Sequence, residues 1–238
     1  MNNYKKLEAG RSMIEMLGVL AIIGVLSVGG IAGYSKAMNK FKTNKIADNV
    51  SMLVANIKTL YAQQNTYDGL DNETAVSMGV VPDELVQKTY KQDGTLDATK
   101  LMNAFNGDVD IHVSGSTDAT DKKAFVLAFS GISREACITL ATNDWGSGYS
   151  SGLIAIRASG ESSTGTGTDA TGADRLAIDG VFIGDPGTKL SGNTDTTVKA
   201  AVATPGGKNL SVPMSVVEAA QSCSCTRGNT CSLQWKYY

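Results

Sequence analysis

A single carboxylate, that of Glu15, stands at the edge of a long apolar run. Residues 16–35 contain no charged side chain, and a helix of about 20 residues spans the ~30 Å apolar core of a bilayer. An ionisable group beside such a segment is costly and usually functional. In an assembly that buries it, Glu15 needs a cationic partner, and Arg11 supplies one from the same chain or from a neighbouring chain.

Four cysteines, Cys137, Cys223, Cys225 and Cys231, provide a second possible chemistry. An even number of cysteines outside the apolar run favours disulfides formed in an oxidising compartment such as the periplasm. The residues alone leave all three pairings open, although Cys225 and Cys231 flank a segment that can form a tight loop. A metal cluster is the alternative reading, disfavoured because zinc sites usually have C-x₂-C spacing.

His112 is the only histidine, so a histidine-based zinc site would need cysteines that are distant in sequence. We interpret it as an ordinary strand residue, because Ile111 and Val113 flank it in an alternating segment. We find no glycine-rich phosphate loop and no nucleophile with a local base motif. The formal net charge of -2 does not indicate the basic surface that is typical of nucleic-acid-binding proteins. We therefore expect no enzyme activity, cofactor, metal or nucleic-acid partner.

One long helix must carry Glu15 and the apolar run. Apolar positions continue beyond residue 35 at spacings of three to five, which predicts an amphipathic helix that ends near Gln64. We predict a helix over 11–64, with 16–35 spanning a membrane. From about Met13 to Gln64 its length is on the order of 75 Å, which exceeds what one domain can bury, so the first half must contact lipid or other chains. It contains five glycines, Gly18, Gly24, Gly29, Gly30 and Gly33, each of which weakens a helix. We expect Gly24, Gly29, Gly30 and Gly33 to make the helix flexible, and Gly29 and Gly33 are spaced to let helices approach closely.

Residues 65–238 alternate between short helical and strand patterns, which predicts an α+β head domain. Ser133 is placed to cap a helix that carries Cys137. The residues 159–174 are rich in glycine, serine and threonine, which is typical of an exposed mobile loop. The other segments predicted are helices near 74–78, 82–86 and 213–222, and strands near 109–113, 124–130, 152–158, 176–183 and 232–238.

The N-terminal region resembles the processing site and first helix of type IV prepilins. Residues 1–10 form a short basic leader that ends in Gly10, and Glu15 is the fifth residue after that glycine. The resemblance implies cleavage after Gly10 by a prepilin peptidase and N-methylation of Arg11, which departs from the apolar residue usual there. It also implies that the glycine-containing part of the helix loses order in a filament. An ordinary secretory signal is the alternative. In that case the small residues at 29–33 would serve as its cleavage site.

The order of elements in the head is similar to type IVb pilins, particularly the PilS-like branch, through Asn103–Gly107 and through Cys137 with Leu140. The resemblance implies the type IV pilin fold, an α/β-roll head with an antiparallel sheet on the long helix. It also implies a disulfide-bounded C-terminal region, with Cys137 paired to Cys223 and then Cys225 to Cys231.

The function that this resemblance implies is that of a structural subunit of a type IVb-like pilus on a Gram-negative bacterium. The expected partners are further copies of the chain, a prepilin peptidase, an assembly platform and its ATPase. The protein is expected to cross the inner membrane once, with a cytoplasmic N-terminus and a periplasmic head, before it enters an extracellular pilus. The alternatives are a minor pilin or type II secretion pseudopilin, and a membrane-anchored periplasmic binding module.

Overall fold

The computed structural model describes residues 8–87, 89–90, 96–97, 100–114, 122–146, 152–160, 200–202, 215–223, 225 and 230–238. The chain divides into two compact units, Met1–Phe41 and Lys42–Tyr238. The second unit is the head, and it includes the C-terminal part of the long helix. The predicted strand at 176–183 and most of the predicted loop at 159–174 lie outside the described residues.

The first helix, α1 (Glu8–Leu60), is continuous for 53 residues. It ends four residues before the predicted end at Gln64. Beyond Leu60 the chain closes shorter hydrogen-bonded rings, in which the Gln64 amide donates to the Tyr61 carbonyl at 2.8 Å. Such bonds satisfy the last carbonyl groups of a helix and tighten its final turn.

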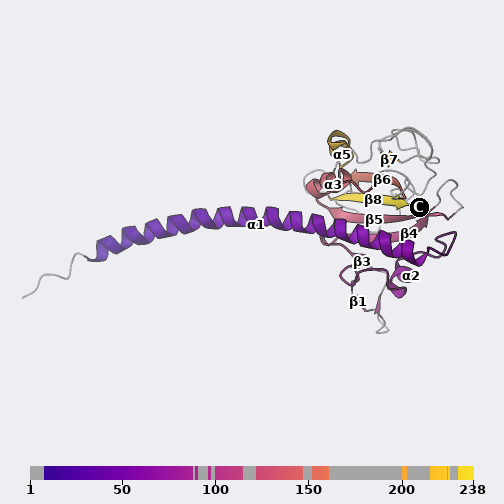
Figure 1. Cartoon of the computed structure of the whole chain (residues 1–238). Coiled ribbons are helices and arrows are strands. Elements are labelled where there is room, and N and C mark those ends of the chain that lie inside the picture. The colour runs from indigo at the N-terminus through magenta and orange to yellow at the C-terminus, as the bar shows by residue number, and fades with distance from the viewer. Residues whose placement is uncertain are drawn as a thin grey trace, which may run out of the picture. The chain divides into compact units, whose positions relative to one another are not determined.

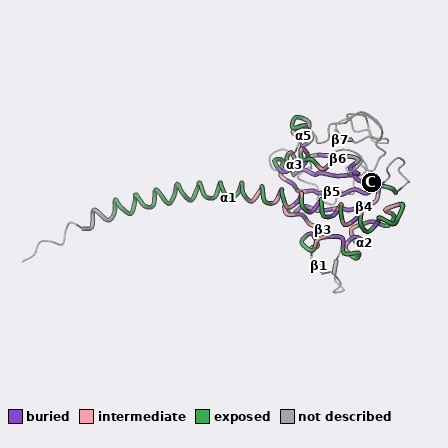
Figure 2. Tube along the Cα trace, in the orientation of Figure 1, coloured by how far each residue is buried: buried purple, intermediate pink, exposed green. Residues whose placement is uncertain are grey.

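Every described side chain from residue 13 to residue 37 is exposed (Figure 2). Among the described residues, one helix, Met13–Leu60, is long and apolar enough to cross a membrane, and none of its most apolar window is buried. A core helix of a soluble domain would be buried there. This part of α1 therefore has no packing partner within its own chain.

The head contains one antiparallel sheet of six strands in the order β3-β4-β5-β8-β6-β7 (Figure 1). The strands are β3 (Leu101–Met102), β4 (Asp108–Ser114), β5 (Ala124–Ile132), β6 (Leu153–Gly160), β7 (Ala200–Val202) and β8 (Cys231–Tyr237). A separate pair is formed by β1 (Thr89–Tyr90) and β2 (Leu96–Asp97), and the short helices are α2 (Asn72–Ser77), α3 (Arg134–Ala141) and α5 (Val216–Ser222). The C-terminal strand β8 therefore lies between β5 and β6, inside the sheet.

The core joins α1 to one face of this sheet. Ile46, Val50, Leu53 and Ile57 follow helical spacing, and all four are completely buried. They belong to one apolar cluster with alternate residues of the central strands, among them Leu127 and Trp235. The amphipathic pattern beyond residue 35 is thereby explained, since its apolar face lies on the sheet.

Most predicted elements of the head are present, but the short helix predicted at 82–86 is wrong. This segment forms a turn, and Val86 then makes an isolated β-bridge with Leu101. The amide of Met102 donates to the carbonyl of Leu85 at 2.8 Å. Pairing with a distant strand has overridden the local helix signal of Pro82 and the acidic residues that follow it.

The outer edge of β4 is covered by Leu70 and by Asn72, the first residue of α2. The Asn72 side chain donates to the Val109 carbonyl at 3.2 Å and accepts from the Ile111 amide at 2.7 Å. The Val113 amide donates to the Leu70 carbonyl at 3.2 Å. Because β3 reaches only the beginning of β4, these bonds satisfy groups that an open strand edge would offer to another chain.

We expect Asn72→Ala to lower the free energy of unfolding by about 2–3 kcal/mol, because it removes two hydrogen bonds and leaves a half-buried amide and carbonyl without partners. Urea unfolding of the full chain in detergent measures this through tryptophan fluorescence, since both tryptophans belong to the head. Asn143→Ala, at an exposed position after α3, is the control and should change stability by less than about 0.5 kcal/mol. Equal effects of the two substitutions would contradict the edge-covering role.

Candidate assembly helix and disulfide centre

The predicted processing and assembly residues all lie on α1. Gly10 and Arg11 are inside the helix, which begins at Glu8, and the Glu15 side chain is exposed one turn later. Residues four apart lie on the same face of a helix, so Arg11 and Glu15 share one. Their roles in processing and pairing stay predictions, because the single chain contains neither the peptidase nor a neighbouring subunit.

No contact within the chain requires glycine in the apolar half of α1. A Cβ atom added at Gly24, Gly29, Gly30 or Gly33 would meet nothing within 4 Å. Each glycine nevertheless costs roughly 1 kcal/mol of helix stability relative to alanine. The benefit of these glycines must therefore come from outside the single chain, in lipid or in contact with another helix.

Gly107 of the head shows the opposite situation. A Cβ atom at this position would overlap the Ser130 carbonyl, so the turn between β3 and β4 can lie against β5 only with glycine there. The Asn103 side chain fixes the same turn: it donates to the Ser130 carbonyl at 2.7 Å and accepts from the amides of Phe105 and Gly107. The Asn103–Gly107 motif is thus a turn that is bonded to the β5 backbone.

This turn also reaches α1. The Nζ atom of Lys42 lies 5.5 Å from the centre of the Phe105 ring, within the range of a cation–π contact. Farther along α1, Lys45 forms an ion pair of 2.9 Å with Glu84, and the Asn56 side chain donates to the Val80 carbonyl at 2.9 Å. Polar contacts therefore fix the segments around 80–84 and 103–107 along the helix.

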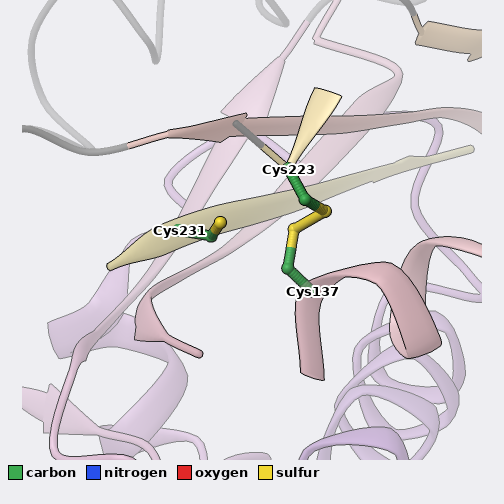
Figure 3. Close-up of side chains that lie close together, drawn as sticks. All are labelled: Cys137, Cys223 and Cys231. Carbon is green, nitrogen blue, oxygen red and sulfur yellow. A yellow bond between two sulfur atoms is a disulfide. The ribbon is translucent and has the colours of Figure 1, made fainter. Parts of the chain in front are cut away.

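The two disulfides join Cys137 to Cys223 and Cys225 to Cys231, so the favoured pairing is confirmed. The first bridge connects α3 to the residue that follows α5 (Figure 3). Arg134 supports the same junction, since its side chain donates to the carbonyls of Cys223 and Ala220 at the end of α5. As predicted, Ser133 caps α3 by accepting from the Ala136 amide.

Three of these sulfur atoms could also be considered as metal ligands, because those of Cys137, Cys223 and Cys231 all lie within 4.8 Å of one another. The form of cysteine that binds a metal is the thiolate. All four cysteines are bonded in disulfides, so none offers a thiolate in this state.

His112 is a residue of β4, as predicted, and is paired with Val126 of β5. Its ring lies 2.8 Å from the Asp110 carboxylate, on the same side of the strand. The sequence reasoning missed this contact, although the i, i+2 spacing of the two residues in a strand could have indicated it. The histidine is buried within the sheet.

An exposed apolar helix joined to a disulfide-bonded α+β head agrees with the type IV pilin fold that the sequence resemblance implies. Residues 40–177, more than half of the chain, match the family model described as PilS N terminal, so the chain belongs to the PilS family.

Curated relatives of the chain include two pilus proteins. The major structural subunit of the bundle-forming pilus of Escherichia coli O127:H6 is 28% identical over 142 residues, which are 60% of this chain and 68% of that protein. The toxin coregulated pilin of Vibrio cholerae is 26% identical over 136 residues, which are 57% and 58% of the two chains. Among solved structures, the crystal structure of TcpA, a type IV pilin from Vibrio cholerae El Tor biotype, covers 83% of this chain and 99% of its own, with 16% identity and a TM-score of 0.49.

The two disulfides should contribute unequally to stability. In the chain-entropy model, removing the Cys137–Cys223 bridge, whose residues are 86 apart, costs about 4–5 kcal/mol. Removing the Cys225–Cys231 bridge, whose residues are 6 apart, costs about 2 kcal/mol. We expect this order when the two double alanine variants are compared by urea unfolding in detergent. Equal losses, or a greater loss without the short bridge, would refute the chain-entropy account.

Proposed function

We propose that this pilin is the structural subunit of a type IVb pilus, and that its work is assembly and not catalysis. The observation that carries the proposal is the apolar surface of α1. Thirteen large apolar side chains between Met13 and Tyr34 are each between 52% and 75% exposed in the single chain. A soluble monomer rarely presents an apolar surface of that extent to water.

Two environments can cover this surface in turn. Before assembly the apolar half of α1 lies in the inner membrane, with the N-terminus in the cytoplasm and the head in the periplasm. After assembly the helices of neighbouring subunits replace the lipid in the filament core, where small residues such as Gly29 and Gly33 allow close approach. The two curated relatives are named as a pilus subunit and as a pilin, which supports assembly of this chain into a pilus.

Assembly needs proteins that act on this chain. We propose that a prepilin peptidase cleaves after Gly10 and methylates the new terminal residue, Arg11, and that a platform protein and an ATPase drive extraction from the membrane. The glycines between Gly24 and Gly33 lower the cost of stretching the helix during this step, because each is a poor helix former.

Gly10→Leu should leave an unprocessed membrane protein and no filaments, because a side chain before the cleaved bond crowds the peptidase cleft. Mass spectrometry of the mature N-terminus and electron microscopy of sheared cells measure the two outcomes. Gly18→Leu is the matched control: it adds the same side chain to α1, at a position with nothing within 4 Å, and should be processed normally. Normal maturation of Gly10→Leu would refute the leader reading.

In this proposal Glu15 sets the vertical alignment of neighbouring subunits in the filament. Cleavage gives Arg11 a cationic α-amine in addition to its cationic side chain. An unpaired carboxylate inside the filament core is strongly disfavoured, so Glu15 pairs with Arg11 of an adjacent subunit. Desolvation offsets most of the Coulomb attraction of such a pair, and its effect is therefore on vertical alignment more than on affinity. Pairing within one chain would contribute only about 0.3–0.5 kcal/mol.

We expect Glu15→Ala to be processed and inserted like the wild type, yet to be excluded from filaments formed with wild-type subunits. The ratio of the two subunits in purified pili, compared with their ratio in the membrane, is the measurement. Glu15→Gln, which keeps the shape and loses the charge, should be excluded in the same way. Entry of Glu15→Ala at its membrane ratio would leave only the local pair with Arg11 and would end the intermolecular proposal.

A further inference from the structure

The two disulfides are neighbours in the core of the head. The sulfur atoms of Cys137, Cys223 and Cys231 lie within 4.8 Å of one another, although only the first two are bonded to each other. Figure 3 shows the Cys231 sulfur beside the bridge between α3 and the end of α5. Cys231 itself is bonded to Cys225, which is not a member of this group of three.

A free Cys231 at this place would react with the long bridge. Its thiolate would attack the sulfur of Cys137 or of Cys223 and form a new bond, and the other sulfur would leave as a thiolate. One disulfide replaces another, so the exchange needs no oxidant or reductant. All three residues are completely buried, which holds the reacting sulfurs together at a high effective concentration.

Loop entropy does not protect the native pairing against this exchange. A bridge from Cys137 to Cys231 closes a loop only slightly longer than the native one, and a bridge from Cys223 to Cys231 closes a much shorter loop. The native pairing therefore needs another source of specificity.

We propose that the Cys225–Cys231 bridge supplies this specificity, because it occupies the Cys231 sulfur and thereby keeps Cys137 paired with Cys223. The short bridge joins residues 6 apart and closes a small loop, so it can form before a bridge whose residues are 86 apart. Each bridge forms by exchange with a disulfide oxidant, which takes up two electrons and two protons. In this order Cys231 is already bonded when Cys137 meets Cys223. The inference is independent of the assembly function.

The test is Cys225→Ser in the full chain, held in detergent and equilibrated with oxidised and reduced glutathione at about pH 8, where thiolates form. The sample is quenched with acid, its free thiols are alkylated under denaturing acidic conditions, and its bridges are mapped in non-reduced peptides. We expect bridges from Cys231 to Cys137 or Cys223 in amounts comparable to the native bridge. A sample that contains only Cys137–Cys223 and fully alkylated Cys231 would overturn the proposal.

Cys231→Ser is the matched control, since it also leaves one free thiol. That thiol belongs to Cys225, which lies outside the group of three sulfurs, so the native Cys137–Cys223 bridge should remain alone. Extensive exchange in this variant as well would show that any free thiol scrambles the bridges, and it would overturn the specific role of Cys231.

The wild-type chain gives a second measurement that does not require a variant to fold. Partial reduction with a limiting dithiol should produce species in which Cys231 is bonded to Cys137 or Cys223. Their fraction should rise from about pH 6 to about pH 8, because the attacking group is the thiolate. Partially reduced species that never contain such a bridge would also overturn the proposal.

Discussion

The burial of Ile46, Val50, Leu53 and Ile57 against the sheet is the interaction on which the head depends. Each side chain is completely removed from solvent, and full burial of such a residue contributes about 1.5–3 kcal/mol. Together they contribute roughly 6–12 kcal/mol, which is on the order of the whole stability of a domain. The helix is apolar on every side near its N-terminus, where it can contact lipid or neighbouring subunits. Farther on it is amphipathic, and its apolar face packs in the head.

Because β8 lies inside the sheet, folding of the head depends on contacts between residues that are far apart in the chain. This last strand separates β5 from β6, so the sheet is incomplete until residues 231–237 have been inserted. Contacts between residues far apart in sequence fold slowly, because the entropy of closing the loop is lost before the contacts form. The Cys137–Cys223 bridge and the bonds of Arg134 to the end of α5 hold the chain close to β8 once they have formed.

Features that depend on local periodicity could be predicted from the sequence. The apolar run, the amphipathic part of α1, the capped helix α3 and the alternating strands β4 and β5 all follow from neighbours in the chain. The pairing of the cysteines was open from the residues alone, and a family resemblance was needed to favour it.

Features that depend on distant partners could not be predicted. Val86 forms a bridge instead of a helix because Leu101 is available to it. The need for glycine at position 107 comes from the Ser130 carbonyl, which is 23 residues away in the chain. The contribution of Asn72 likewise comes from the edge of β4, which no local pattern reveals. In each case the contribution of the residue to stability depends on a backbone group that comes near it only in the folded chain.

The two faces of β8 explain how this inserted strand finds its register. Cys231, Leu233, Trp235 and Tyr237 join the core that contains α1, whereas Gln234 and Lys236 alternate with them and are also buried. In the antiparallel ladder, Lys236 lies opposite Val126, which in turn lies opposite His112. A slip of one residue would exchange the faces and place a lysine and a glutamine among the aromatic rings around Trp235. A buried lysine is a poor source of stability, but here the cost of misplacing it excludes the neighbouring registers.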